Sequence, residues 1–311
     1  MAVTQTQYPH PQPAQKSSKG LWIVIGTLAA VVIAVAIFLY TNINSNDRRT
    51  DSMNNSLSKS ADSGAPPGAP AGNASASSSA KPDNNAISSS TVGDPRIEET
   101  LNNYVAALGG REAIESVTSR VAKGTLEMPD LGVAGTVETY QKAPNKYVFI
   151  MNVPSMGVVR SGYNGSTGWA QELNLELRRL EGAELEAMKR EADFYKEIRL
   201  KDLYSKLSFD GKQSVEGHDA NVITAIPPEG GSQKWYFDAK TGLLLRTDED
   251  RQTLEGTNTT ESYIDQYKMV NGINLPFQMR LESGMVKFVI KIKEITHNVP
   301  INDSIFNMPN Y

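Results

Sequence analysis

Residues 277–293 of this chain read Phe277-Gln-Met-Arg-Leu-Glu-Ser-Gly-Met-Val-Lys-Phe-Val-Ile-Lys-Ile-Lys293. On both sides of Ser283-Gly284, apolar side chains recur at every second position, namely Phe277, Met279, Leu281, Val286, Phe288, Ile290 and Ile292. Successive side chains of a strand point to opposite faces of a sheet, so this period predicts two antiparallel strands joined by a turn. One face of that sheet is predicted to be buried and the other exposed to solvent.

The same period of two begins upstream, at Val117. Residues 135–142 and 145–153 form a second predicted hairpin around Ala143-Pro144. Turn signals rich in Gly, Pro, Asn and Asp separate further strand candidates at about 205–216, 219–226, 233–238, 243–249 and 259–268. The chain therefore contains about ten predicted strands in sequential hairpins.

Two regions have helical spacing instead. Asp94 and Pro95 are suited to the N-cap and first position of a helix that ends at Gly109-Gly110, and a short helix follows from Arg111 to about Ser116. A second helical region, inserted between strands, runs from Glu181 to about Tyr204, with an apolar stripe of Leu185, Met188, Ala192, Tyr195 and Ile198.

These elements predict a mainly β (α+β) fold. We expect a curved antiparallel sheet, or incomplete β-barrel, with helices covering its concave side. A plain β-sandwich would not require the helical insertion.

The N-terminal part differs from the rest of the chain. Residues 21–40 carry no charge over a length that crosses a bilayer, with Trp22 and Tyr40 at the two ends. They are predicted to form a transmembrane signal-anchor helix between a cytoplasmic tail (1–20) and a disordered Ser/Ala/Pro/Gly-rich tether (41–92), followed by the folded domain (93–311). A cleaved signal peptide is the nearest alternative, but the apolar run is long and no Ala-x-Ala site follows it.

The orientation of the anchor is less sharply defined by charge. Lys16 and Lys19 precede the span, and Arg48 and Arg49 follow it, so the flanking charges are nearly balanced. The closer lysine pair and the long domain after the anchor favour an exported domain.

Composition excludes several function classes. The formal net charge of -4 argues against a nucleic-acid backbone as the main partner, and zero cysteines exclude disulfides and thiolate chemistry. The histidines show no metal-ligand spacing, and His218 and His297 are predicted to be surface or turn residues. Residues 164–169, Asn-Gly-Ser-Thr-Gly-Trp, do not match a nucleophile elbow. We therefore predict no catalytic residues, no metal site, no cofactor and no enzymatic activity.

The distribution of apolar side chains is more informative about function than the polar motifs are. Strand 145–153 places its aromatic and Met side chains on one face, and Met residues suit adaptable apolar pockets. Ordinary core packing is the simpler interpretation, and a cavity that accepts an acyl chain is the functional one. The candidate cavity residues are Phe149, Met151, Val153, Met156, Trp169, Met188, Met279 and Phe288.

Several strings then occur in a suggestive order: Tyr104-Val-Ala-Ala-Leu-Gly-Gly-Arg-Glu-Ala-Ile114, Lys142-Ala-Pro-Asn-Lys146, Tyr163-Asn-Gly-Ser-Thr-Gly-Trp169, Tyr236-Phe-Asp-Ala-Lys-Thr-Gly-Leu-Leu244, Gly272-Ile-Asn-Leu-Pro276 and Asn302-Asp-Ser-Ile-Phe-Asn-Met-Pro309. Over about 97–309 this set resembles the outer-membrane lipoprotein-sorting (LolA/LolB-like) superfamily, especially its poorly characterised, membrane-anchored bacterial members. The resemblance implies an incomplete antiparallel barrel, covered by helices, whose hollow binds lipoprotein acyl chains or related lipids.

Two departures from that superfamily matter. Its LolA-type carriers are soluble after signal cleavage and its LolB-type receptors are lipidated at a cysteine, whereas this chain has an apolar span and no cysteine. The resemblance therefore implies a non-enzymatic binder of lipid or lipoprotein, tethered to the bacterial inner membrane with its domain in the periplasm. An envelope sensor or assembly adaptor that docks a partner protein is the alternative.

Overall fold

The computed structural model describes residues 93–154, 156–173, 176–253, 256–283 and 286–310. The predicted tail (1–20), membrane anchor (21–40) and tether (41–92) lie outside the described residues. Within the described part, no helix is long and apolar enough to cross a membrane.

The described part of the chain consists of short helices and a larger number of strands. The helices are α2 (Pro95–Ala107), α3 (Arg111–Glu115), α4 (Gly182–Ala192) and α5 (Leu200–Leu203), with 3-10 turns η1 (Pro129–Leu131), η2 (Lys196–Ile198) and η3 (Asp303–Phe306). The strands are β1 (Ser119–Met128), β2 (Val133–Lys142), β3 (Lys146–Val153), β4 (Gly157–Tyr163), β5 (Gly168–Gln171), β6 (Arg178–Arg179), β7 (Lys206–Val215), β8 (His218–Ile226), β9 (Gln233–Asp238), β10 (Leu244–Thr253), β11 (Gly256–Asp265), β12 (Lys268–Val270), β13 (Ile273–Leu275), β14 (Gln278–Ser283) and β15 (Val286–His297). As predicted, Asp94 caps α2, because its carboxylate accepts the Arg96 N–H at 2.9 Å.

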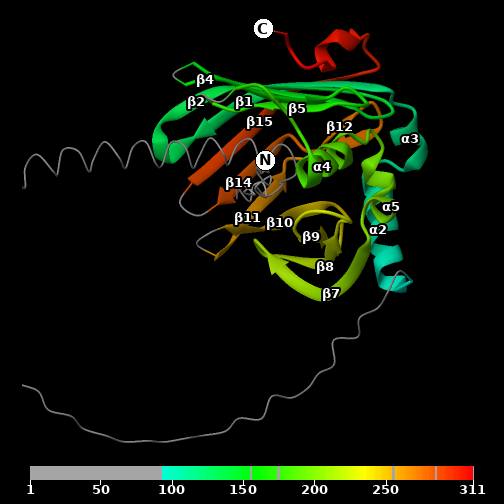
Figure 1. The fold of residues 1–311 in the computed structure, drawn as a ribbon. Helices are drawn as coiled ribbons and strands as arrows, with labels where there is room; N and C mark the ends of the chain where they lie inside the picture. The colour runs from blue at the N-terminus through cyan, green and yellow to red at the C-terminus, as the bar shows by residue number, and fades with distance from the viewer. Residues whose placement is uncertain (1–92, 155, 174–175, 254–255, 284–285, 311) are drawn as a thin grey trace, which may run out of the picture.

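Thirteen of these strands form one open antiparallel sheet in the order β6-β5-β4-β3-β2-β1-β15-β14-β11-β10-β9-β8-β7. The pairing of β1 with β15 joins its two halves. The predicted alternation in 277–293 is confirmed, since Leu281, Phe288 and Ile290 are buried while Lys287 and Lys291 are exposed. The sheet curls so that β7–β11 turn back beneath β1–β5, which confirms the mainly β prediction (Figure 1).

The helical insertion has a topological cause. Strands β6 and β7 are neighbours in the chain but lie at opposite edges of the sheet. The connection between them, which we call the crossing segment (residues 180–205), must therefore pass from one edge to the other. It does so inside the curl, where α4 contacts β3, β4 and β5 (Figure 1).

The helical region predicted from Glu181 to about Tyr204 consists of three separate pieces, α4, η2 and α5. It breaks at Asp193, whose backbone is extended and whose carboxylate accepts the Tyr195 N–H at 3.0 Å and an Arg199 N–H at 2.5 Å. Phe194 N–H donates to the carbonyl of Pro144 at 2.9 Å instead of continuing the helix. Tertiary contacts with the β2–β3 turn thus override the helical pattern.

Two apolar cores lie inside the curl. The larger core joins β1–β5, β14 and β15 to Met188 and Ala192 of α4. The second packs α2 and α3 against β7, β8 and β9 through Ile97, Trp235 and Phe237 among others. Helices therefore cover the inner face of the sheet, as the period-two strands with one buried face require.

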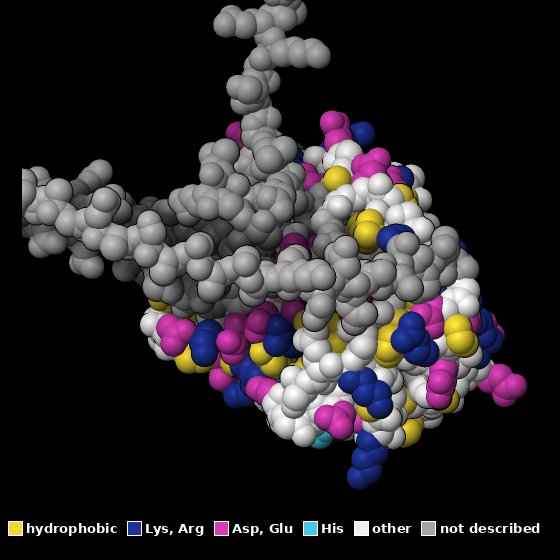
Figure 2. Space-filling model, turned by 90° about the horizontal axis from the view of Figure 1, so that it is seen from below, with side chains coloured by type: hydrophobic (Ala, Val, Ile, Leu, Met, Phe, Trp, Pro, Cys, Tyr) yellow, Lys and Arg dark blue, Asp and Glu magenta, His cyan; other side chains and the backbone are white. Residues whose placement is uncertain are grey.

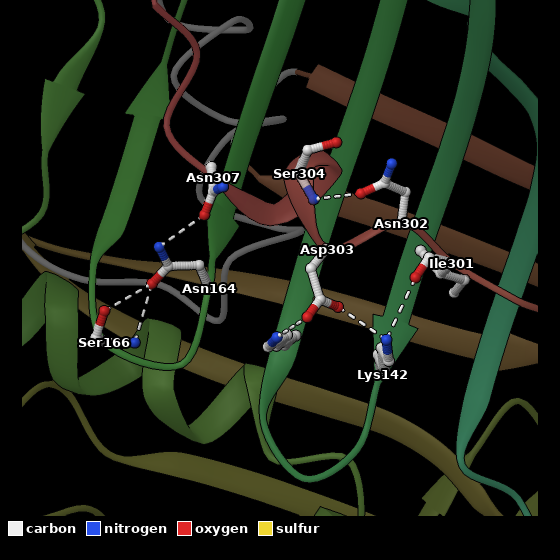
Figure 3. A network of polar contacts seen from close by, with 9 residues as sticks. Lys142, Asn164, Ser166, Ile301, Asn302, Asp303, Ser304 and Asn307 are labelled. Atoms are coloured by element: carbon white, nitrogen blue, oxygen red, sulfur yellow. Dashed lines mark hydrogen bonds and ion pairs between the residues drawn. The ribbon is translucent and has the colours of Figure 1, made fainter.

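The end of the chain covers part of the outer face. In what we call the C-terminal segment (residues 299–309), Phe306 is fully buried against Val148 and Trp169. Figure 3 shows the polar contacts that hold this segment: Asp303 is paired with Lys142 at 2.8 Å, and Asn164 donates to Asn307 at 3.0 Å. Asp303 is also paired with Lys146 at 2.7 Å, and the two lysines lower the pKa of its carboxyl to about 2.

Candidate functional site

A largely apolar cavity of about 190 Å³ remains between the inner face of the sheet and the crossing segment. Its walls come from five strands of the large sheet, from α4, from β13 and from Pro276 just before β14. The lining residues are Arg120, Ala122, Val137, Thr139, Gln141, Tyr147, Phe149, Glu191, Leu275, Pro276, Gln278, Met279, Ile290, Ile292 and Ile295. We call this the apolar cavity.

The register of the paired strands places the lining residues of the apolar cavity in successive rows. One row across the sheet holds Arg120 opposite Gln141, and the next inward-facing row on the same strand holds Ala122 opposite Thr139 and Ile295. Val137 lies two rows beyond Arg120, about 13 Å along the strand. The cavity is therefore polar at the Arg120 row and mostly apolar beyond it, where Thr139 and Gln278 are the polar lining residues.

Arg120 and His297 are hydrogen-bonded to each other at that polar row. The Arg120 Nε–H donates to His297 Nε2 at 3.2 Å, so the neutral imidazole carries its proton on Nδ1. Burial, together with the adjacent Arg120 charge, lowers the pKa of His297 to about 4. The guanidinium also lies over the Phe194 ring, 5.6 Å from its centroid. At neutral pH the pair thus carries one positive charge, located on Arg120.

Glu191 is the other charged group on the wall, and it is already paired. Its carboxylate contacts Lys196 Nζ at 2.6 Å. Desolvation lowers the pKa of that lysine, but the neighbouring carboxylates Glu191 and Glu197 more than offset it, so the net shift is upward. This ion pair contributes no net charge to the cavity.

A second cavity of about 260 Å³ lies on the other side of Met279 and Glu191, which line both. Its wall is mixed in character and includes Arg190, Lys196, Trp235 and Glu249 among the lining residues. We call it the mixed cavity. Met279 is half-buried, and an unbranched thioether side chain changes rotamer at little cost, so we expect that it can move and connect the two spaces.

The sequence-predicted cavity residues divide into three groups. Phe149 and Met279 line the apolar cavity. Met151, Val153, Met188 and Phe288 are fully buried in the larger core beneath it, and Met156 packs against that core. These five residues support the cavity without lining it.

Trp169 lies on the opposite face of the sheet, which corrects the expectation that it faces the cavity. It packs with Val148 and Phe306, and its Nε1–H donates to the Phe306 carbonyl at 2.9 Å. The cause is register: Trp169 is opposite Gly162, which is opposite Val148, and all three positions face outward. Sequence alone does not show which face of a four-residue strand is inward.

The prediction that both domain histidines are surface or turn residues holds for exposed His218 and is wrong for His297, which is half-buried in β15. Sequence reasoning also missed Arg120. A single arginine in a period-two strand is usually solvent-facing, and only the alternation with Ala122 placed it inward. That alternation is the one signal that pointed to it.

Other features of the described chain carry less chemistry. No group of three His, Cys, Asp or Glu side chains in the described ranges could hold a metal. A polar hollow of about 320 Å³ lies beside α2, but the Asp238 carboxylate within it already accepts the Lys240 and Thr241 N–H groups. On the face shown in Figure 2, Lys/Arg and Asp/Glu side chains are interspersed, with apolar side chains scattered between them.

No family model and no curated protein matches this chain. Solved structures do match, over 68% of the chain. They include a DUF1329 family protein from Desulfovibrio piger (15% identity, TM-score 0.49, 97% of that chain covered) and a LolA superfamily protein from Nitrosomonas europaea (11% identity, TM-score 0.47, 96% covered). A domain from Vibrio parahaemolyticus, named as an outer-membrane lipoprotein-sorting protein, matches at 12% identity and TM-score 0.45, with 94% covered. Two of these three structures are named for the superfamily that the sequence resembles.

Proposed function

We propose that this domain is a non-enzymatic binder of a single lipid acyl chain, held on a tether (41–92) from a membrane anchor (21–40) and facing the periplasm. The observation that carries the proposal is the apolar cavity between the curled sheet and the crossing segment. Its volume of about 190 Å³ exceeds the cavity of about 150 Å³ that accepts a benzene molecule, and lies below the range of about 300 Å³ and above that is usual for larger ligands. One aliphatic chain suits this space, and a multi-chain lipid does not.

The surface supports chain binding over partner docking. Among the described residues, the exposed large apolar side chains are Val158, Ile226 and Met269, which lie on three different elements. The sheet edges offer poor templates for an added strand, because β6 has two residues and β7 is interrupted by a bulge near Gly211. A periplasmic adaptor that docks a partner protein is therefore the second interpretation, with less to support it.

The decisive test fills the cavity. Ala122 is buried, lines the cavity and has cavity residues on both sides, so Ala122→Phe places a ring inside it. Ala134→Phe adds the same ring at an exposed position of β2 and is the matched control. Full-length protein in phosphatidylcholine nanodiscs is titrated with radiolabelled alkan-1-ols of increasing length, a neutral probe of the chain site.

Each buried methylene contributes about 0.8 kcal/mol, so affinity should rise about fourfold per carbon until the cavity is full. Ala122→Phe should abolish this component and Ala134→Phe should leave it. Equal binding by all three proteins, with no single-chain lipid co-purifying with the full-length chain in mass spectrometry, would overturn the proposal.

A further inference from the structure

Arg120 is a cation at the end of a mostly apolar space, and the described chain brings no carboxylate into contact with it. No Asp or Glu oxygen of the described residues lies within 4.0 Å of its guanidinium. Its one hydrogen bond there is the Nε–H contact with neutral His297 at 3.2 Å. The two terminal amino groups, with four of the five N–H donors, are thus left for another acceptor.

The neighbouring carboxylates do not contact the Arg120 guanidinium. Glu191 is held by Lys196 at 2.6 Å, and Glu197 acts on Arg120 only at longer range. Burial lowers the pKa of the Arg120 guanidinium, but an arginine stays protonated at neutral pH. The Arg120 guanidinium at the polar row of the apolar cavity therefore has Glu197 as a longer-range counter-charge and no carboxylate in contact with it.

A guanidinium is costly to bury when no anion contacts it. A ligand anion would recover that cost, because hydrogen bonds between an arginine fork and a carboxylate or phosphate are short, bidentate and charge-assisted. His297 occupies the Nε–H, so the pair of terminal amino groups is the edge that remains for a two-oxygen acceptor.

We propose that Arg120 anchors the anionic headgroup, a carboxylate or a phosphate monoester, of a single-chain amphiphile whose chain fills the apolar cavity. This inference rests on the proposed function and names its ligand class. The chain would extend from the Arg120 row past Ala122 toward Val137, which is the apolar direction of the cavity.

The test compares headgroups on one chain length. Full-length protein in zwitterionic nanodiscs is titrated with decanoate, decyl phosphate, decan-1-ol and decyltrimethylammonium, and binding to the Ala122→Phe protein is subtracted as background. Decanoate or decyl phosphate should bind about ten- to a hundredfold more tightly than decan-1-ol, and decyltrimethylammonium most weakly. The ratio of decanoate to decyl phosphate identifies which acid is preferred.

Two variants assign the effect to the side chain. Arg120→Gln should reduce the affinity for both anions to the affinity that the same variant has for decan-1-ol. Arg120→Lys should retain part of it, because it keeps the charge and loses the fork. Lys123→Gln, which removes an exposed positive charge from the same strand, is the matched control and should change nothing.

The two proposals fail in different ways. Equal affinity for all four headgroups, unaffected by Arg120→Gln, would overturn the headgroup assignment and leave chain binding intact. Binding of no probe above the Ala122→Phe background would overturn chain binding itself. If Arg120→Gln loses decan-1-ol binding as well, its role is to shape the cavity, and the headgroup assignment is again overturned.

Discussion

Gly109 lies where the end of α2 meets the turn between β12 and β13. Its φ of +117° is unfavourable for any residue with a side chain, and a Cβ there would lie 2.1 Å from the Gly272 carbonyl oxygen. Gly132 is a matched comparison, since its φ is +63° and a Cβ added there would meet no heavy atom of the described chain within 4 Å beyond its immediate neighbours. Left-handed backbone costs about 1–2 kcal/mol for a residue with a Cβ.

We expect Gly132→Ala to lower the free energy of unfolding by about that amount. Gly109→Ala should cost about 1–3 kcal/mol more, because backbone must move to make room. Urea denaturation followed by circular dichroism measures both. Equal costs would show that the α2 end adapts freely, in contradiction to the close approach.

His297 makes stability depend on pH in a defined direction. Its pKa is about 4 in the folded chain, against 6.5 ordinarily. The unfolded chain therefore binds this proton more readily, so the stability contribution is fully present above pH 6.5 and is lost as the pH falls toward 4. His297→Gln keeps an acceptor for the Arg120 Nε–H and should flatten that part of the curve of unfolding free energy against pH. Parallel curves for the two proteins would contradict the assignment.

The alternation of apolar and polar residues along a strand predicts which side chains are buried. It does not predict which of them line the cavity. It placed Phe149, Met279 and Phe288 on the inner face correctly. The alternation does not distinguish residues that line the apolar cavity from residues packed in the larger core, because that difference depends on the position of α4. Arg120 was missed for the same reason, since its importance depends on how distant described segments pack around it without bringing a carboxylate into contact.

At the scale of elements, the C-terminal segment depends on one side chain more than on its ion pairs. Phe306 is fully buried against Val148 and Trp169, whereas the Asp303 carboxylate is 56% exposed. Phe306→Ala should lower the free energy of unfolding by about 3–5 kcal/mol, because it leaves a cavity in this core.

Asp303→Asn is the matched test of the ion pairs in the same segment. It should have a much smaller effect, and the effect should vanish at high salt because exposed pairs are screened. Urea denaturation at low and high salt measures both variants. A larger loss from Asp303→Asn than from Phe306→Ala would show that charge, not burial, holds the segment.

The predicted helical region from Glu181 to about Tyr204 shows that a local pattern does not reveal where a helix is interrupted. Its apolar stripe was real, since Met188 and Ala192 are buried in the larger core. The break at Asp193 comes from a hydrogen bond between Phe194 and Pro144, about fifty residues away in the chain. A helical period alone holds no information about that partner.

For the whole molecule, the order of strands creates the site. Because β6 and β7 lie at opposite edges of the sheet, the chain between them must cross the inner face, and the crossing segment encloses both cavities against it. The sequence predicted a curved sheet with an inserted helix, but not that the insertion joins the two edges. Pairing of β1 with β15, which closes this topology, links residues about 170 apart and has no local signal.

That topology makes the length of the bound chain depend on one side chain. Met279 lines both the apolar cavity of about 190 Å³ and the mixed cavity of about 260 Å³, and we expect its side chain to divide them. Met279→Ala should join them, at a cost of about 2 kcal/mol in unfolding free energy, and should shift the preferred ligand to a longer chain. Met279→Leu conserves volume and should leave the preference unchanged.

A series of fatty acids from octanoate to hexadecanoate, titrated into full-length protein in nanodiscs, measures the preference as the carbon number beyond which affinity stops rising. In the wild-type chain the plateau should come early, because a longer chain meets Met279. In Met279→Ala the rise should continue by several carbons at about fourfold each, since every added methylene still finds apolar surface. A plateau at the same carbon number in both proteins would mean that the ligand does not reach Met279. The mixed cavity would then take no part in binding the chain.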